Sequence, residues 1–321
     1  MIAKAPLRFR PYLKTVIWGG DRICAYKGIE QPEPNIGESW EISCVPGHES
    51  VVDEGAYEGF TLRELIERFG ASLLGDAVYE RYGANFPLLI KLIDANDNLS
   101  VQVHPDDDLA MKRHNSLGKT EMWYIINTDD NAKIFAGLNT EMTPDEYVKR
   151  VADGSFAEAL AVHSSKPGDV FFLPAGRVHA IGAGNLLAEI QESSDVTYRI
   201  YDYDRRDANG NTRELHTDLA KDAIDYTVYD NYKSPSVPDD VNECEIVSCE
   251  HFTTLRIIVN GETSLNLPDD SFSVIMCIEG EVTLRFEDGE MSLKTGETVL
   301  LPADVREMRT IGNATLLQSY I

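Results

Sequence analysis

One segment occurs twice in this sequence: Lys166-Pro-Gly-Asp-Val-Phe-Phe-Leu-Pro-Ala-Gly-Arg-Val-His179 and Lys294-Thr-Gly-Glu-Thr-Val-Leu-Leu-Pro-Ala-Asp-Val-Arg-Glu307. Lys, Gly, Leu, Pro and Ala align without gaps, and Asp169 pairs with Glu297. Each copy combines a glycine turn, a short apolar run of strand length and a Pro-Ala corner. The repetition predicts two related β-barrels in one chain.

Strand patterns dominate the two regions that contain these copies, about 86–202 and about 245–321. Short runs rich in β-branched and aromatic residues are separated there by Gly, Pro, Asn and Asp, as in antiparallel sandwiches and barrels. The segment 232–241 between the regions is polar and proline-rich, which is typical of a linker. We therefore expect a mainly β protein with an N-terminal domain over 1–235 and a C-terminal domain over 236–321.

Helical signals interrupt the strand pattern in a few places. Thr61 is an expected N-cap, because a glutamate follows three residues later and apolar residues recur at helical spacing. Thr143 repeats this signal, with proline at the first helical position. We expect a small helical insertion at about 140–162, with helices near 144–152 and 155–162.

The composition of the whole chain limits the classes of function. The 321 residues carry a formal net charge of −25. This charge repels nucleic acids and anionic membrane surfaces, so neither is an expected partner. An anionic substrate requires a locally basic pocket in such a chain. No run of residues approaches the ~20 apolar residues that cross a bilayer, and the segment Met1–Lys14 lacks the apolar core of a signal peptide. A cytoplasmic enzyme is the expectation.

The cysteines fit this location. The sequence has five, widely scattered and without a CxxC pair, which predicts reduced packing residues rather than a zinc finger or a redox motif.

Four polar side chains near expected strand ends form a candidate metal site. Gln102 and His104 lie two residues apart in a strand-like run, so a period of two points both to one face. Glu121 precedes the next strand pattern, after a polar loop over 112–118, and His179 ends the first repeat copy. Nitrogen and oxygen donors without thiolate suit zinc with an open coordination position, or manganese, iron or cobalt. A histidine at a strand end is, however, more often a hydrogen-bonded rim residue, so the residues alone leave both interpretations open.

The rest of the chain adds no comparable ligand. The second repeat copy carries Glu307 at the position of His179, which predicts a second barrel that has lost its metal site. The remaining histidines are interpreted as surface or packing residues: His48, His114, His163, His216 and His251.

Several blocks around the candidate site resemble the hallmark blocks of type I mannose-6-phosphate isomerases, also called phosphomannose isomerases. In chain order these blocks are Ser100-Val-Gln-Val-His-Pro-Asp, Gly118-Lys-Thr-Glu-Met-Trp-Tyr, Pro174-Ala-Gly-Arg-Val-His-Ala-Ile and Ala188-Glu-Ile-Gln-Glu-Ser-Ser-Asp-Val-Thr-Tyr-Arg-Ile-Tyr-Asp-Tyr. The opening Arg10-Pro-Tyr-Leu, Trp18-Gly-Gly and Gly37-Glu-Ser-Trp-Glu-Ile-Ser are similar to the family's N-terminal pattern. The resemblance covers about residues 8–206, and the tail from 245 fits the family's C-terminal cupin half. The short distance from Glu121 to His179 resembles the short bacterial form.

The resemblance implies a fold and a metal site. The fold is a pair of cupin-type (jelly-roll) β-barrels, of which the first binds one Zn²⁺ per chain and the second binds no metal. Carried over position by position, the metal ligands are Gln102, His104, Glu121 and His179.

The resemblance also implies catalytic and substrate-binding residues. Arg199 matches the family's catalytic arginine and is expected to contact the substrate. Glu189 matches a carboxylate of the same pocket and is the expected proton-shuttling base. Ser100 and Lys119 match positions near the substrate or its phosphate, and Lys119 is also expected to act in catalysis. Without the resemblance, Arg199 has a plainer interpretation as a surface ion pair with Asp202 or another nearby aspartate.

The expected activity is the interconversion of mannose 6-phosphate and fructose 6-phosphate, an aldose–ketose isomerisation through an enediol. A metal ion polarises substrate oxygens in such chemistry, and an always-protonated arginine stabilises the developing oxyanion. Two alternatives keep the same fold: a metal-dependent isomerase or epimerase of another sugar, and a non-catalytic sugar-binding cupin. The expected partner is a small sugar phosphate, and the exposed strand edges of the second barrel are open either to pairing between copies or to the N-terminal segment.

Overall fold

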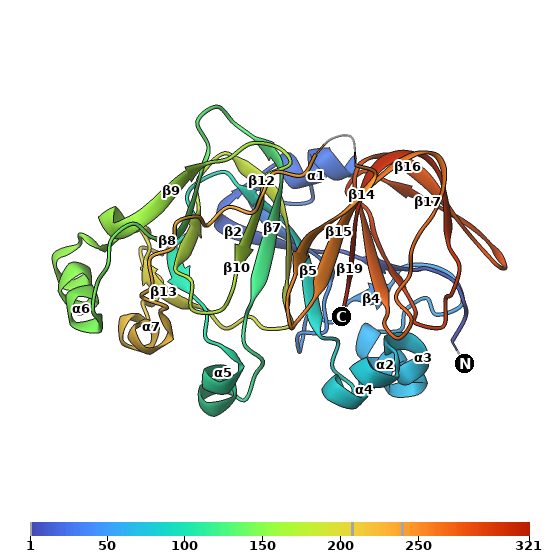
Figure 1. Cartoon of the computed structure of the whole chain (residues 1–321), viewed down its shortest axis with the longest axis horizontal. Helices are drawn as coiled ribbons and strands as arrows, with labels where there is room; N and C mark the ends of the chain where they lie inside the picture. Colours follow the sequence, from blue (N-terminus) through green and yellow to red (C-terminus); the bar gives the residue numbers. More distant parts are fainter. Residues whose placement is uncertain (1, 207–208, 239–240) are drawn as a thin grey trace.

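The computed structural model describes residues 2–206, 209–238 and 241–321, which form three antiparallel sheets with helices at their margins (Figure 1). The prediction of a mainly β fold is confirmed. The sheets remain open and pack on one another rather than closing into barrels, as in a cupin-like sandwich. No helix among the described residues is long and apolar enough to span a membrane.

Two of the sheets pack face to face and form what we call the N-terminal unit. Their shared core includes Ile93, Trp123 and Leu187 from one sheet and Ile134 and Ile181 from the other. The six-stranded sheet has the order β10 (Val170–Leu173), β7 (Glu121–Thr128), β12 (Asn185–Glu192), β5 (Leu88–Ala95), β3 (Ile36–Ile42) and β2 (Tyr12–Gly20). The five-stranded sheet has the order β13 (Tyr198–Tyr201), β6 (Val101–Val103), β11 (His179–Ile181), β8 (Lys133–Leu138) and β9 (Leu160–Ser164).

The third sheet contains the C-terminal unit, which we define as the strands after residue 242. Its order is β14 (Glu243–Ser248), β15 (Thr253–Ser264), β19 (Arg309–Tyr320), β16 (Ser273–Phe286), β18 (Thr298–Leu301), β1 (Leu7–Arg10) and β4 (Val51–Val52), with β17 (Gly289–Lys294) paired to β16. The N-terminal strand β1 thus crosses to the far unit, where Leu7 lies opposite Leu300 of β18. The strand edge of the second unit was expected either to pair with another copy or to be covered by the N-terminal segment. At β18, the N-terminal strand β1 covers it.

The two repeat copies fold alike. In the first, Asp169 accepts a hydrogen bond from the Lys166 N–H at 2.9 Å; in the second, Glu297 accepts one from the Lys294 N–H at 2.8 Å. Both turns contain a glycine with positive φ, and the strand after each turn is β10 or β18. The predicted structural repeat is confirmed.

The helices lie outside the sheets. They are α1 (Arg22–Lys27), α2 (Leu62–Phe69), α3 (Ala71–Leu74), α4 (Asp76–Tyr82), α5 (Asp107–His114), α6 (Pro144–Asp153) and α7 (Thr217–Ala223). Capping boxes begin α2 at Thr61 and α6 at Thr143, as predicted.

Two local predictions were right only in part. The segment 155–162 contains one short 3-10 helix, Phe156–Ala159. The chain then enters strand β9, because the residues from Leu160 onward pair with β8. The segment 112–118 was expected as a polar loop, but its first three residues form the last turn of α5, which ends at His114.

The expected linker is anchored at its start. The Tyr232 side chain is buried, and its hydroxyl donates to the Leu138 carbonyl oxygen at 2.8 Å. The ring lies so close to Gly137 that a Cβ there would be 2.0 Å from it. Asp239 and Asp240 of this segment lie outside the described residues, and the domain boundary at 235/236 remains a prediction.

Candidate metal centre

Four predicted ligands come together between the two sheets of the N-terminal unit. Gln102 lies in β6, and His104 follows the same strand. His179 is the first residue of β11 and lies directly opposite Gln102 in the sheet register. Glu121 is the first residue of β7 in the facing sheet. The ends of strands from both sheets therefore contribute donors to one point, as the sequence pattern predicted.

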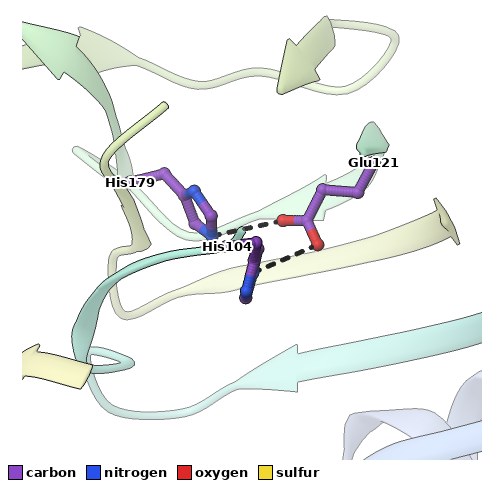
Figure 2. A group of neighbouring side chains, drawn as sticks. All are labelled: His104, Glu121 and His179. Carbon is purple, nitrogen blue, oxygen red and sulfur yellow. Dashed lines mark ion pairs between the residues drawn. The ribbon is translucent and has the colours of Figure 1, made fainter. Parts of the chain in front are cut away.

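The Glu121 carboxylate faces both imidazoles, one oxygen toward each ring (Figure 2). Its Oε1 is 3.2 Å from His179 Nε2, and its Oε2 is 3.5 Å from His104 Nε2. Both carboxylate oxygens are fully buried and receive no well-directed hydrogen bond from the described residues. Buried carboxylate oxygens without such donors are costly unless a positive charge lies close by. Lys119 Nζ lies 3.1 Å from Oε2, and a bound cation would supply a charge to both oxygens.

Backbone carbonyl groups fix the tautomer of both histidines. His104 Nδ1 lies 3.0 Å from the Val196 carbonyl oxygen, and His179 Nδ1 lies 2.8 Å from the Arg177 carbonyl oxygen. A carbonyl oxygen only accepts, so each Nδ1 carries the proton and donates it. Each Nε2 therefore presents its lone pair toward Glu121, which is the arrangement of metal-binding histidines whose other nitrogen is held by a backbone acceptor.

Gln102, the fourth predicted ligand, lies beside these three residues. Its amide nitrogen Nε2 lies 3.2 Å from His179 Nε2, and its amide oxygen Oε1, the atom that would bind a metal, accepts a hydrogen bond from Ser100 Oγ at 3.4 Å. The ligand atoms of His104, Glu121 and His179 all lie within 4.8 Å of one another. Two imidazoles, a carboxylate and an amide fit a divalent metal with an open position, and zinc accepts all these donor types.

Burial shapes the protonation of these groups. Burial lowers the pKa of His179 to about 4 and lowers the pKa of His104 well below its usual value, so both rings are neutral. Burial raises the pKa of Glu121 to about 7, although the Lys119 ammonium opposes this change. A divalent cation would stabilise the ionised form of Glu121.

Lys119 belongs to the metal end of the site. Its Nζ lies 3.1 Å from Glu121 Oε2 and 3.2 Å from His104 Nε2, and the side chain is buried. The structure therefore places this predicted residue beside the candidate metal ligands.

A cavity of about 370 Å³ opens beside Gln102 and Lys119. Among the side chains that line it are five cations and three carboxylates: Lys14, Lys91, Lys119, Arg199 and Arg213, with Glu38, Glu189 and Asp195. The cavity is therefore locally basic although the whole chain carries a formal charge of −25. An acidic chain needs such a locally basic pocket if it is to bind an anionic substrate.

Arg199 faces this cavity and is not the surface ion pair of the plainer interpretation. Its Nε donates to Ser100 Oγ at 3.3 Å and its Nη1 donates to the Glu214 carbonyl oxygen at 3.0 Å. Asp202 instead binds Arg205 and Arg213. Two of the three predicted substrate-binding residues, Ser100 and Arg199, are thus in direct contact.

Glu189 also lines the cavity, with both carboxylate oxygens engaged. Its Oε1 accepts from Lys91 Nζ at 3.0 Å, and its Oε2 accepts from Trp123 Nε1 at 2.9 Å. Burial alone raises the pKa of Glu189, but the ammonium groups of Lys91 and Lys119 and these two hydrogen bonds lower it to about 2. A carboxylate with so low a pKa is a weak base, which disfavours the expected role in shuttling a proton.

Lys91, Arg213 and His216 are among the lining residues that were not predicted as site residues. Lys91 bridges Glu189 and Gln191, with Glu38 at 3.8 Å. Arg213 and His216 come from a loop after β13, and the His216 ring nitrogen accepts a hydrogen bond from the Arg199 N–H. A signal existed for Lys91, because a lysine inside the apolar run 88–93 is unusual in a buried strand. His216 was interpreted as a surface or packing residue and had no such signal.

Comparison with known proteins identifies two matching family models. The catalytic domain of type I phosphomannose isomerase matches residues 7–134, and the cupin domain of mannose-6-phosphate isomerase matches residues 242–321.

Full-length relatives and a solved structure agree with these matches. Mannose-6-phosphate isomerase ManA of Bacillus subtilis is 37% identical, with 98% of this chain and 99% of the relative aligned. Mannose-6-phosphate isomerase of Streptococcus mutans is 33% identical, with 98% of each chain aligned. The crystal structure of the mannose 6-phosphate isomerase from Bacillus subtilis superimposes with a TM-score of 0.90 at 37% identity, covering 99% of this chain and 100% of that one.

Proposed function

This chain belongs to the type I phosphomannose isomerase family, and on that premise we propose that it interconverts mannose 6-phosphate and fructose 6-phosphate with one zinc ion and an enediol intermediate. The observation that carries the proposal is the cluster of Gln102, His104, Glu121 and His179 at the end of a cation-lined cavity. The free cysteines, three of them buried, support a cytoplasmic location.

The chain supplies binding and charge for this reaction. When bound, zinc would act as a Lewis acid toward the oxygens on the two carbons that exchange oxidation state. Arg199 carries a permanent positive charge at the cavity wall, where it stabilises the negative charge of an enediol oxygen or the phosphate. Ser100 orients the Arg199 side chain through its hydroxyl group. Lys119 Nζ lies 3.1 Å from Glu121 Oε2, beside the residues that would hold the metal, where it can contact an anionic group of the substrate.

The proton transfer requires a different account from the one expected for Glu189. We propose that Glu189 stays ionised and holds the Lys91 ammonium in the cavity wall, because both of its oxygens are already engaged. Lys91 is fully buried, and the carboxylates of Glu189 and Glu38 outweigh the effect of burial and raise its pKa. The two carboxylates neutralise the Lys91 ammonium and fix its position in the cavity wall. A bound sugar would therefore contact hydrogen-bond donors that are already ordered.

A coupled assay tests the proposal. The purified chain is incubated with mannose 6-phosphate after metal removal, and fructose 6-phosphate formation is followed before and after zinc is restored. We expect turnover that is lost without metal and regained with zinc, and weak turnover of unphosphorylated mannose. Turnover of a different sugar phosphate alone would favour the alternative isomerase or epimerase. Binding of sugar phosphates without turnover by the zinc-loaded chain would favour the sugar-binding cupin.

A further inference from the structure

Two carboxylates hold the backbone on either side of Lys119. The Gly118 N–H donates to Asp107 Oδ1 at 2.7 Å, and the Thr120 N–H donates to Glu192 Oε2 at 2.7 Å. Hydrogen bonds to an ionised acceptor are among the stronger ones in proteins. The position of the Lys119 side chain beside the metal ligands therefore depends on these two acids.

The segment has little freedom to shift within this frame. A Cβ on Gly118 would lie 2.6 Å from the Asp107 backbone nitrogen, so only glycine fits there. The Lys119 N–H donates to the Pro105 carbonyl oxygen at 3.1 Å. The Glu192 N–H donates to the Thr120 carbonyl oxygen at 3.1 Å, which makes the contact of these two residues reciprocal.

One histidine of the C-terminal unit contacts Glu192 and lies near Asp107. His251 lies in the turn between β14 and β15, which is closed by a hydrogen bond from the Cys249 N–H to the Phe252 carbonyl oxygen at 3.0 Å. His251 Nδ1 lies 3.0 Å from Glu192 Oε1, and the ligand atoms of Asp107, Glu192 and His251 all lie within 4.8 Å of one another. The turn thus brings one ring to the two acids that frame Lys119.

Charge gives this contact its importance. The Glu192 side chain is only 5% exposed, and a carboxylate so buried requires a counter-charge. The contact with Glu192 raises the pKa of His251 and outweighs the opposite effect of burial, and Asp107 adds to the increase. The contact therefore favours the imidazolium form of His251, whose positive charge would lie beside the two acids.

We propose that His251 is a positioning residue for the isomerase reaction: it anchors Asp107 and Glu192, which hold Gly118 and Thr120 and so place Lys119 at the metal site. The inference deepens the proposed function and rests on it. It also gives the C-terminal unit a role in the reaction, although none of the described residues that line the cavity belongs to that unit.

The test compares His251→Ala with Glu250→Gln in the zinc-loaded, full-length chain. Glu250 is the exposed neighbour of His251 and pairs with Arg81, so its variant is a matched control. We expect His251→Ala to lower kcat by about tenfold, because small displacements of catalytic groups slow reactions strongly. KM and zinc content should stay near those of the parent, and Glu250→Gln should behave as the parent. His251→Gln provides a second variant should His251→Ala fold poorly.

Two further measurements separate positioning from a general structural role. Glu192→Gln lowers kcat as well, and adding His251→Ala to it should lower kcat little further, because both act through the same contact. Amide hydrogen exchange of residues 118–121 should be faster in His251→Ala than in the parent, whatever the activity.

Several results would overturn the inference. The inference is wrong if His251→Ala leaves both kcat and the amide exchange of residues 118–121 unchanged. It is also wrong if the kcat loss of the double variant equals the product of the losses of the two single variants. A second divalent ion per chain that His251→Ala removes would show that the three side chains bind metal instead. An inactive parent would count against the proposed function, whereas the exchange measurement would still decide the role of His251.

Discussion

Arg199 is the cation of the cavity whose partners are neutral. Its guanidinium donates to a hydroxyl and a backbone carbonyl, and among the described residues no carboxylate lies within ion-pair distance of it. Burial and the nearby Arg213 lower its pKa, which remains far above neutrality for a guanidinium. A positive charge held in this way favours an anionic substrate group.

Replacing Arg199 tests this account at the residue scale. We expect Arg199→Ala to lower kcat/KM for mannose 6-phosphate by about 10²–10³, because the loss of one preorganised donor has effects of this size. Arg199→Lys should recover part of the loss, since a lysine keeps the charge but not the forked geometry. Steady-state kinetics on both variants provide the measurement, and unchanged kcat/KM in Arg199→Ala would remove this arginine from the mechanism.

The raised pKa of Glu121 predicts how zinc affinity depends on pH. Zinc binds the ionised carboxylate, so below the pKa of about 7 a proton must leave first and the affinity falls as the pH falls. The expected slope is up to about tenfold per pH unit below that value, with little change above it. His179, with a pKa of about 4, should add nothing until the pH approaches that value. Competition with a chromophoric chelator measures the slope. It should vanish in Glu121→Gln, and a slope that persists there would assign the proton to another group.

The site residues that were predicted could each be recognised from their immediate neighbours in the sequence. Gln102 and His104 stand on one strand, and period-two geometry alone places both on one face. His216 reaches the cavity because a loop folds back over β13, and no local pattern records that path. The weak basicity of Glu189 likewise depends on Lys91 and Trp123, which belong to two other strands.

Local capping signals decide the helix boundaries. The Thr61 hydroxyl accepts from the Glu64 N–H, and the Glu64 carboxylate accepts from the Thr61 N–H. We expect Thr61→Ala to lower the free energy of unfolding by about 1 kcal/mol, because one N–H of the first turn loses its acceptor. Thr61→Ser keeps the oxygen and should remain close to the parent. Chemical denaturation measures both, and equal stability of all three proteins would show that the cap contributes nothing.

Helix α5 shows why some elements escape prediction. Its N-cap Asp106, its acids in the first turn and its bases in the last turn are all visible in the sequence. Its one buried residue is Ala110, so it lacks the apolar stripe by which an amphipathic helix is recognised. The segment 155–162 shows the opposite case: the helical turn stops at Ala159, because the residues from Leu160 onward pair with β8 as strand β9.

At the scale of the whole molecule, the two units share a sheet and a core. Strands β1 and β4 come from the N-terminal part of the chain yet extend the C-terminal sheet. One buried cluster contains Ile42 and Leu92 of the N-terminal unit together with Val274 and Leu300 of the C-terminal unit. The repeat predicted two related barrels, and its two copies do fold alike, but the pairing of β1 with β18 joins residues almost 300 positions apart. Such a pairing leaves no trace in a local pattern.

The shared core predicts that both units unfold together. Calorimetry should show one cooperative transition, and Leu300→Ala should destabilise the entire protein by about 2–5 kcal/mol, because this fully buried side chain leaves a cavity. Fluorescence of the tryptophans, which all lie before residue 124, should report the same midpoint as the calorimeter. Two separate transitions, of which the Leu300 variant shifts only one, would show that the units are independent.

Zinc titration of the metal-free chain tests the central claim most directly, because it links the cluster between the sheets to the isomerase activity. Activity on mannose 6-phosphate should rise in proportion to added zinc and stop rising at one equivalent per chain. The His179→Ala variant, titrated in parallel, should show no such break. Full activity without metal, or an unchanged break in the variant, would contradict the assignment of Gln102, His104, Glu121 and His179 as the site where the reaction takes place.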